Sequence, residues 1–472
     1  MALAVSPAPT TAAATPAAET RVVCLDGVRG LMTLLVLVSH YFGEVPHGIN
    51  SLMFAWLAVD MFFVLSGYLV GKLILEKQHN DNFFQVFYAR RVCRTLPIYF
   101  VCLALNIVLM GYFTAPWAEF DGSFPLWSYF TFTQNFFMAA TGGIGAHWLS
   151  PTWTLAVEEH FYLIVPLLFF VIPRRRIAVM LAAIAAGALV SRACVYELLA
   201  DPGLIGLVLL PTRADVLTAG LLAAVAIKSN LPWQLIDNPL RIAPIVLLGM
   251  TAVLRLIDKD TGHCFGIFGP LLVSAACAMF LLSLVRGAPE AKRFHSKFLG
   301  FFNTTSYAVY LTHLPVLGLM HGIVLGSRPD LVTPAQWAVT IAALPVCVAV
   351  SWLLTVAVEK PLTAYGRSFA WSATGPAKRA SVLKRPRPAR RQARAFLALL
   401  HLIFSRDRVA SSSNPHARCR VIVSPLGIEA WVTREAGRLA GAAAKQVRSR
   451  INLKTRQDAR PHDPADAPCA YR

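Results

Sequence analysis

The stretch GIFGPLLVSAACAMFLLSLV occupies residues 266–285 and contains no charged side chain. An α-helix needs about 20 apolar residues to cross roughly 30 Å of hydrocarbon. Lipid offers no hydrogen bonds to a backbone, and a helix satisfies its own, so this stretch is expected to be a transmembrane helix. Similar apolar runs recur along most of the chain. They predict an all-α polytopic membrane protein.

The composition of the whole chain agrees with this fold class. Of 472 residues, 56% are hydrophobic and only 15% are charged, with a mean hydropathy of +0.55. Soluble globular proteins carry about 25% charged residues, so the composition excludes that class. The nine cysteines include no C-x-x-C pair, so neither a zinc site nor a disulfide framework is predicted and no metal is expected.

Ten transmembrane helices place most short loops rich in Lys and Arg on one side, as the positive-inside rule requires. With both termini in the cytoplasm, the predicted spans are residues 28–45, 52–75, 95–113, 152–172, 177–196, 204–227, 242–256, 266–285, 307–325 and 337–358. An even number of spans, with both termini on the same side, leaves residues 126–138 as a non-spanning segment. We expect this segment to be interfacial or re-entrant and to line a cavity.

The net charge of +19 belongs mainly to the C-terminal part of the chain. From residue 370 onward there are 21 Lys or Arg against 6 Asp or Glu, which leaves 23 against 19 before it. We therefore expect a leader at 1–20, a membrane domain at 21–369 and a basic, largely disordered cytoplasmic tail at 370–472. The tail suits a membrane surface with anionic lipid, and no nucleic-acid partner is expected.

The first predicted helix carries two polar side chains eleven positions apart, Arg29 and His40. Eleven residues bring the helix back to nearly the same face, about 16 Å further along its axis. Arg29 is then expected near the cytoplasmic rim and His40 inside the membrane. An intramembrane histidine indicates function, since an imidazole accepts and returns protons near neutral pH. The alternative is a structural histidine that is hydrogen-bonded between helices.

Two further motifs extend this polar set. The segment VDMFFVLSGYLVG (59–71) contains Asp60, which could orient the His40 imidazole or lie at a helix end among the headgroups. The loop segment FYARRVCRTLPIY (87–99) brings Arg91 and Arg94 to the mouth of the third helix. These arginines either anchor the helix or hold the phosphates of a nucleotide-bearing substrate.

The segment WTLAVEEHFYL (153–163) begins with Trp153 and buries Glu158, Glu159 and His160 within an apolar span. Adjacent carboxylates are costly in a membrane, which favours a functional role. Neighbouring residues on a helix point about 100° apart, so one of the two glutamates is expected to face the cavity.

Two weaker groups of polar residues lie further along the chain. In PTRADVLTAG (211–220), Arg213 and Asp215 are interpreted as a mutually neutralising pair. In TSYAVYLTHLP (305–315), Tyr310 and His313 could hydrogen-bond a substrate, or His313 could be a satisfied core histidine.

Taken in this order, these segments resemble acyltransferase family 3, the integral-membrane O-acyltransferases of the bacterial O-acetylase type. The resemblance covers residues 24–369 and includes VEKPLTAYGR, which ends at Arg367. It implies a ten-helix core in which Arg29 and His40 are essential and the Arg91/Arg94 pair is important. One departure is His160, where the family usually carries Gln. The tail does not resemble the extracytoplasmic hydrolase domain of some members, and we expect the enzyme to act without it.

The resemblance implies an acyl-CoA-dependent O-acyltransferase in the bacterial inner membrane, in contact with membrane lipid. Acetyl-CoA would be the co-substrate, and the acceptor a hydroxyl of a cell-envelope glycan, a lipo-oligosaccharide or a small molecule. The predicted catalytic residues are His40, Arg29, Glu158 and Glu159, and those binding acyl-CoA are Arg91 and Arg94. The predicted cavity residues are Asp60, Trp153, His160, Arg213, Tyr310 and His313. The competing hypotheses are a proton-coupled transporter or exporter and a membrane scaffold.

Overall fold

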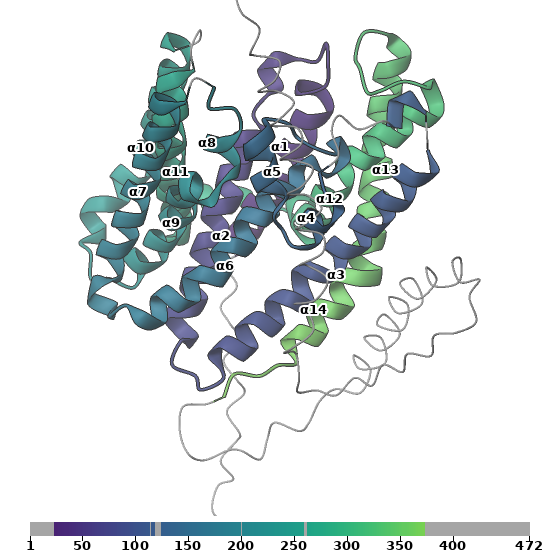
Figure 1. Cartoon of the computed structure of the whole chain (residues 1–472). Helices are drawn as coiled ribbons and strands as arrows, with labels where there is room; N and C mark the ends of the chain where they lie inside the picture. Colours follow the sequence, from purple (N-terminus) through teal and green to yellow (C-terminus); the bar gives the residue numbers. More distant parts are fainter. Residues whose placement is uncertain (1–22, 114, 119–123, 200, 259–261, 373–472) are drawn as a thin grey trace, which may run out of the picture. The chain divides into compact units, whose positions relative to one another are not determined.

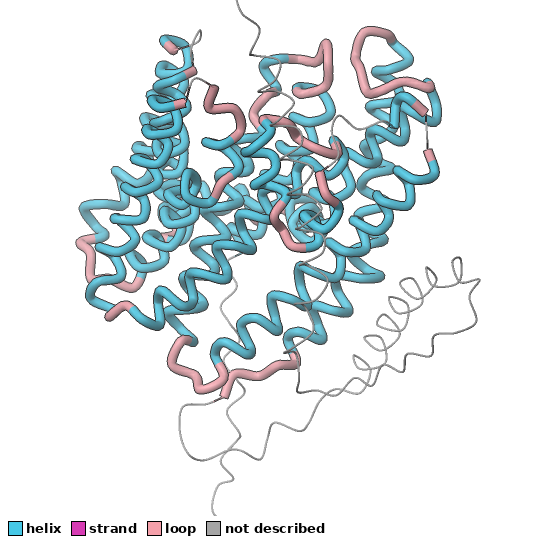
Figure 2. Tube along the Cα trace, viewed as in Figure 1, coloured by secondary structure: helices cyan, strands magenta, loops and turns pink. Residues whose placement is uncertain are grey.

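The computed structural model describes residues 23–113, 115–118, 124–199, 201–258 and 262–372. All regular structure within these residues is helical (Figure 1, Figure 2). Among them are ten helical segments long and apolar enough to cross a membrane, which confirms the predicted polytopic all-α fold. Their main helices are α1 (Val23–Val38), α2 (Ala55–Lys77), α3 (Phe83–Tyr112), α6 (Trp153–Val171), α7 (Ile177–Leu198), α9 (Leu210–Ile227), α10 (Trp233–Ile257), α11 (His263–Val285), α12 (Lys297–Leu325) and α13 (Pro334–Leu354).

The helices pack in two groups around α1 and α2. Helix α9 packs along α2 and is joined by α7, α10 and α11 on one side of Figure 1. Helices α12 and α13 lie on the other side, with α12 against α1. Helix α3 lies beside α14 (Lys360–Arg367). The polar cavities described below lie where the two groups meet.

The crossing of α2 and α9 depends on two glycines. A Cβ added at Gly67 would lie 2.1 Å from the carbonyl oxygen of Leu217, and one at Gly220 would lie 2.0 Å from that of Val64. Such distances are far below van der Waals contact, so only glycine allows the two backbones to come this close. This close crossing brings side chains two turns earlier on each helix into direct contact.

Several helices are longer than predicted. Helix α3 begins at Phe83 rather than at residue 95, and α12 begins at Lys297 rather than at residue 307. Apolar runs mark only the part of a helix inside hydrocarbon, whereas long basic side chains let the helix continue into the interface. The prediction of a loop for residues 87–94 is therefore wrong, because Arg91 and Arg94 lie on α3 itself.

The predicted non-spanning segment forms two short helices, α4 (Leu126–Phe130) and α5 (Gln134–Thr141), neither of which is long enough to span. The side chain of Gln134 donates to the carbonyl oxygen of Thr152 at 3.0 Å. That of Asn135 donates to the carbonyl oxygen of Val208 at 3.1 Å, beside the short helix α8 (Ile205–Val208). These hydrogen bonds fix the segment against the beginning of α6 and the α8 turn.

Two π-helical turns interrupt the helices at positions that hydropathy does not mark. The first is Ser39–Gly43, directly after α1, and the second is Thr355–Glu359, between α13 and α14. A 3₁₀ turn, His147–Thr152, leads into α6. The expected leader and nearly all of the expected basic tail lie outside the described residues.

Candidate functional site

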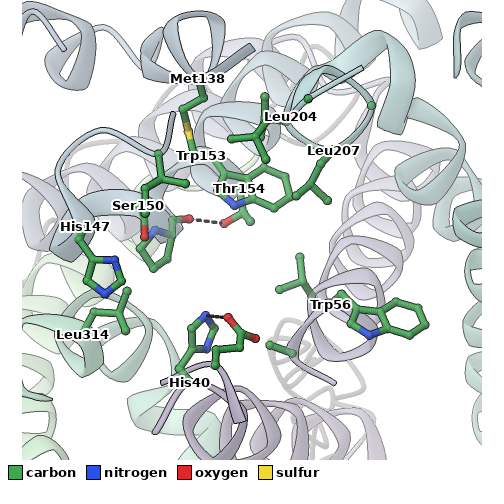
Figure 3. Close-up of a pocket in the computed structure, with 18 of the residues that line it drawn as sticks. His40, Trp56, Met138, His147, Ser150, Trp153, Thr154, Leu204, Leu207 and Leu314 are labelled. Carbon is green, nitrogen blue, oxygen red and sulfur yellow. Dashed lines mark hydrogen bonds and ion pairs between the residues drawn. The ribbon is translucent and has the colours of Figure 1, made fainter. Parts of the chain in front are cut away.

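His40 lies in the first π-helical turn and points into a large cavity (Figure 3). The turn is closed by a hydrogen bond from the backbone N–H of Glu44 to the carbonyl oxygen of Ser39, 2.8 Å long. The Nδ1 of His40 lies 2.9 Å from the carbonyl oxygen of Val36. A carbonyl oxygen can only accept, so Nδ1 carries the hydrogen and the lone pair of the neutral ring is on Nε2. Such π-turns are frequent at functional sites.

A second imidazole lies against the first. The rings of His40 and His313 have centroids 4.8 Å apart, in an edge-to-face arrangement. His313 is only 1% exposed; its Nδ1 is 3.1 Å from the carbonyl oxygen of Val309, and its buried Nε2 has no hydrogen-bond partner. The two predicted histidines, far apart in sequence, are thus brought together.

The cavity at His40 has a volume of about 980 Å³. Figure 3 shows His40 at its base, opposite Thr154 and Trp153, with His147 and Ser150 along one wall and Trp56 on another. Aromatic side chains make up much of its lining. They are Trp56, Trp117, Trp148, Trp153, Tyr196, Phe265 and Tyr310. Such a mixture of aromatic faces with polar and charged side chains is suited to a substantial polar ligand.

A smaller cavity of about 130 Å³ meets the first one. The residues that line both cavities are Val59, Thr154 and Tyr310. The hydroxyls of Thr154 and Tyr310 lie 2.7 Å apart, and the Tyr310 hydroxyl donates to the carbonyl oxygen of Pro151 at 2.9 Å. These shared residues form a junction between the cavities, and the predicted residue Tyr310 lies within it.

The smaller cavity is lined by Arg29, Arg91 and Arg94, together with Glu158. We call these three arginines the arginine cluster. Within the described part of the chain, none of the three has a carboxylate oxygen within 4.0 Å. The guanidinium of Arg91 lies 3.2 Å from the ring centroid of Tyr162, and its buried Nε has no hydrogen-bond partner. Positive charge gathered without direct counter-ions is suited to binding an anion.

The structure distinguishes the two adjacent glutamates. Glu158 lines the smaller cavity and interacts electrostatically with all three members of the arginine cluster. Glu159 instead accepts a hydrogen bond from the hydroxyl of Thr95, 3.2 Å long. Glu158 is therefore the one that faces the cavity, a choice that helical spacing alone left open.

The predicted pairing of Arg213 with Asp215 is wrong. Arg213 forms an ion pair with Asp60, while Asp215 binds Arg192 through two hydrogen bonds of 2.9 and 2.7 Å. Residues two apart on a helix point to different sides, so each turns to a neighbouring helix instead. The ion pair with Arg213 also bears on the role of Asp60, which was expected either to orient the His40 imidazole or to lie at a helix end. The carboxylate of Asp60 instead binds Arg213 on α9, away from the His40 imidazole.

His160 lies apart from the other predicted residues. Its ring stacks on Phe136 of α5, with ring centroids 5.4 Å apart and planes 23° apart. Neither cavity has His160 in its lining. Both cavities lie on another side of α6, where Thr154 and Glu158 point.

Sequence reasoning missed two residues. Glu44 lies with its carboxylate Oε2 3.5 Å from Nε2 of His40. Arg192 is fully buried and is the partner that Asp215 requires. Glu44 comes shortly after an apolar run, so in the sequence it looks like an ordinary residue at the end of a helix. Arg192, by contrast, could have been found, because a lone arginine inside an apolar span needs a buried carboxylate partner.

Comparisons with known proteins identify relatives of this chain. The chain is 26% identical over 372 residues to the Bacillus subtilis protein named "Putative peptidoglycan O-acetyltransferase YrhL", covering 73% of this chain and 55% of that protein. It is 25% identical over 340 residues to the peptidoglycan O-acetyltransferase OatA of Listeria monocytogenes, covering 65% of this chain and 51% of OatA. The chain thus spans about half the length of these relatives. No solved structure matched.

The model of one protein family covers most of the chain. It is the acyltransferase domain of acyltransferase family 3, and it matches residues 22–356. The match includes the arginine cluster, His40 and the junction between the cavities. This chain therefore belongs to the acyltransferase family 3 proteins.

Proposed function

We propose that this protein is an O-acetyltransferase that moves an acetyl group from acetyl-CoA to a hydroxyl of a cell-envelope glycan. The observation that carries the proposal is the pair of cavities that meet at Thr154 and Tyr310. One leads to the arginine cluster and the other contains the imidazole of His40. A donor that carries phosphates and an acceptor that carries a hydroxyl could then meet at the junction.

The arginine cluster is the proposed site of the donor. Guanidinium groups hold phosphates with charge-assisted hydrogen bonds, and the buried Nε of Arg91 still has an unused donor. The smaller cavity, at about 130 Å³, is far below the roughly 300–1,000 Å³ of pockets for drug-sized ligands. Only a part of CoA fits there, so the phosphates would be held where the exposed Arg94 side chain marks the entrance, and the thioester arm would reach inward. The small volume also favours a short acyl group such as acetyl.

His40 is the proposed general base. Its Nε2 takes the proton of the acceptor hydroxyl while that oxygen forms a bond to the thioester carbon. The carbon–sulfur bond then breaks, and His40 returns the proton to the sulfur, which leaves as the CoA thiol. In an alternative order, Nε2 first attacks the thioester carbon, the carbon–sulfur bond breaks, and the CoA thiolate leaves. The acetyl group then passes from Nε2 to the hydroxyl oxygen, whose proton is released to water, and this order predicts ping-pong kinetics. In both orders His40 carries positive charge for part of the reaction.

The large cavity is the proposed site of the acceptor. Its volume of about 980 Å³ admits more than one sugar ring, and its aromatic lining offers faces on which sugars can pack. The named activity of the relatives makes peptidoglycan the first acceptor to test. We further propose that the protein lies in the bacterial inner membrane, with the arginine cluster toward the cytoplasm and His40 toward the outside.

Transfer of radiolabel from acetyl-CoA tests this function. Membranes containing the wild type should label envelope glycan, whereas membranes with His40→Ala should not. A His160→Ala variant serves as the matched control, because that imidazole lies outside both cavities and its loss should leave labelling largely intact. Equal labelling by wild type and His40→Ala would contradict the proposed site. An absence of label in every sample would contradict the proposed donor or acceptor.

A further inference from the structure

Glu44 has no part in the mechanism above, although its carboxylate is the closest one to the reacting imidazole. We propose that Glu44 is a positioning residue that stabilises the positive charge on His40 during transfer. This role rests on the proposed function, because it requires that His40 becomes charged. The carboxylate Oε2 lies 3.5 Å from Nε2 of His40, and both side chains line the 980 Å³ cavity.

The position of the Glu44 carboxylate is fixed by Ser39. The Ser39 hydroxyl oxygen accepts hydrogen bonds from the backbone N–H groups of Phe54 and Ala55, at 3.1 and 3.0 Å. Both of its acceptor sites are then occupied, and its one hydrogen remains to be donated. It is donated to Oε1 of Glu44, 3.2 Å away. The beginning of α2 thereby holds the carboxylate in place through a single hydroxyl.

Glu44 faces a different nitrogen from the one that a carboxylate faces in a Ser-His-Asp triad. In that triad the carboxylate binds Nδ1 and sets the tautomer of the ring. Here the carbonyl oxygen of Val36 already does so. Glu44 lies instead on the side of Nε2, the nitrogen that takes the proton. The separation of 3.5 Å exceeds a hydrogen bond of 2.7–3.2 Å. This leaves the Nε2 lone pair available to an acceptor hydroxyl while the carboxylate remains close enough to stabilise charge.

The other charged groups around the cavity do not provide this negative charge. The described lining contains three carboxylates, those of Glu44, Asp60 and Asp201. Asp60 is already paired with Arg213, and among the described residues Glu44 alone has a carboxylate oxygen within 4.0 Å of the His40 imidazole.

The remaining polar groups near the imidazole are basic or neutral. His313 and Tyr310 come from α12, and His147 comes from the 3₁₀ turn before α6. Arg255 and Arg328 lie elsewhere in the lining. Glu44 is therefore the negative group next to a site that is otherwise rich in histidine and arginine.

The test is acetyl transfer by the full chain with Glu44→Gln and Glu44→Asp. Glutamine keeps the length of the side chain and the hydrogen bond from Ser39, and removes only the charge. We expect Glu44→Gln to lower kcat about tenfold to a hundredfold with little change in KM for acetyl-CoA. Because the imidazolium loses its counter-ion, the acidic limb of the pH–rate profile should also move to lower pH. Glu44→Asp should restore most of the rate and the wild-type profile.

Asp330→Asn is the matched control, because it removes a carboxylate next to a histidine outside the cavity lining. This variant should keep the rate and profile of the wild type. A merely structural role for Glu44 would reduce the amount of folded enzyme without moving the pH profile, and that result would overturn the proposal. So would a Glu44→Gln enzyme with wild-type kcat and profile. If the wild type itself transfers no acetyl, the proposed function fails, and this role for Glu44 fails with it.

Discussion

Two groups of charged residues in the membrane domain differ in how they are neutralised. In the first, which we call the paired-charge region, two aspartates of α2 and α9 bind two arginines of α9 and α7. The pairs are Asp60 with Arg213 and Asp215 with Arg192. In the second, the arginine cluster, three guanidinium groups share a small cavity with a single glutamate in its lining. The first group is neutralised by direct ion pairs, and the second only by carboxylates at longer range.

Under the proposed function, this difference separates charges that hold the fold from charges that bind the donor. Removing one partner of a buried ion pair strands the other in a medium of low dielectric constant. Removing one arginine of the cluster breaks no direct ion pair, although it also ends a longer-range attraction to Glu158. The same substitution of arginine by a neutral residue should therefore lower stability much more in the paired-charge region than in the arginine cluster.

The largest expected effect is on stability in the paired-charge region. Arg192→Met leaves the fully buried Asp215 carboxylate without its partner. The free energy of unfolding should fall by about 3–5 kcal/mol, which thermal unfolding in detergent would show as a much lower Tm. The double variant Arg192→Met/Asp215→Leu should recover most of the loss, since no unpaired charge remains. A single variant as stable as the wild type would show that the pair does not hold the fold.

The next effect is on donor binding at the arginine cluster. Arg91→Met should reduce kcat/KM for acetyl-CoA roughly 10- to 100-fold, the equivalent of ~1.5–3 kcal/mol of charge-assisted hydrogen bonding. Its Tm should fall much less than that of Arg192→Met, because no direct ion pair is broken. Arg90→Met is a useful control on the same helix, because Arg90 donates to the carbonyl oxygen of Phe369 at 2.9 Å and should affect stability instead. A large fall in Tm for Arg91→Met would remove the distinction between the two regions.

A smaller effect should separate the adjacent glutamates. Glu158→Gln removes the carboxylate that lines the smaller cavity and should lower the transfer rate about tenfold. Glu159→Gln can still accept from Thr95 and should lower the rate much less. Initial rates at saturating acetyl-CoA would compare the two variants directly. Equal losses would mean that the cavity does not discriminate between them.

The smallest effect is expected at an exposed pair. His47 Nδ1 lies 2.9 Å from the Asp330 carboxylate, in the loop between α12 and α13, and this hydrogen bond holds the pKa of Asp330 below its usual value. Because this pKa is lowered, the hydrogen bond stabilises the folded protein at any pH above the unfolded pKa of about 3.9. This stabilisation is lost as the pH falls through the pKa of the folded state. Asp330→Asn should therefore lower Tm slightly at pH 7, and the difference in Tm should shrink as the pH falls below about 3.9. A difference that stays constant down to the acid limit of folding would contradict this assignment.

Most of the fold could be predicted from the sequence, because a helix in lipid must be apolar and about 20 residues long. The predicted spans correspond to the ten long helices, and errors such as the late start of α3 concern turns outside the apolar runs. The proximity of His40 to His313 could not be predicted, since it depends on how α1 packs against α12. Nor could the role of Glu44, because it requires the π-helical turn and the hydroxyl of Ser39.

The pairing of buried charges could be predicted in part. The sequence shows two aspartates, Asp60 and Asp215, and the motif PTRADV predicts a partner for Asp215 alone, namely Arg213. Each aspartate inside an apolar span needs a cation to neutralise it, so two aspartates require a second arginine. Arg192, within the fifth span, is that arginine. Such a count predicts which charges must be neutralised, although the choice of partner is made by the close crossing of α2 and α9.

The most direct test of the account is acetyl transfer in sealed vesicles of known orientation, with acetyl-CoA supplied on one side only. The account predicts that acetyl-CoA is used only from the side toward which Arg29, Arg91 and Arg94 face, and that acetylated glycan appears on the side of His40. A His40→Ala protein in the same vesicles should give no product. Product formed equally well with acetyl-CoA on either side, or found on the same side as the donor, would contradict a reaction at the junction of two opposed cavities.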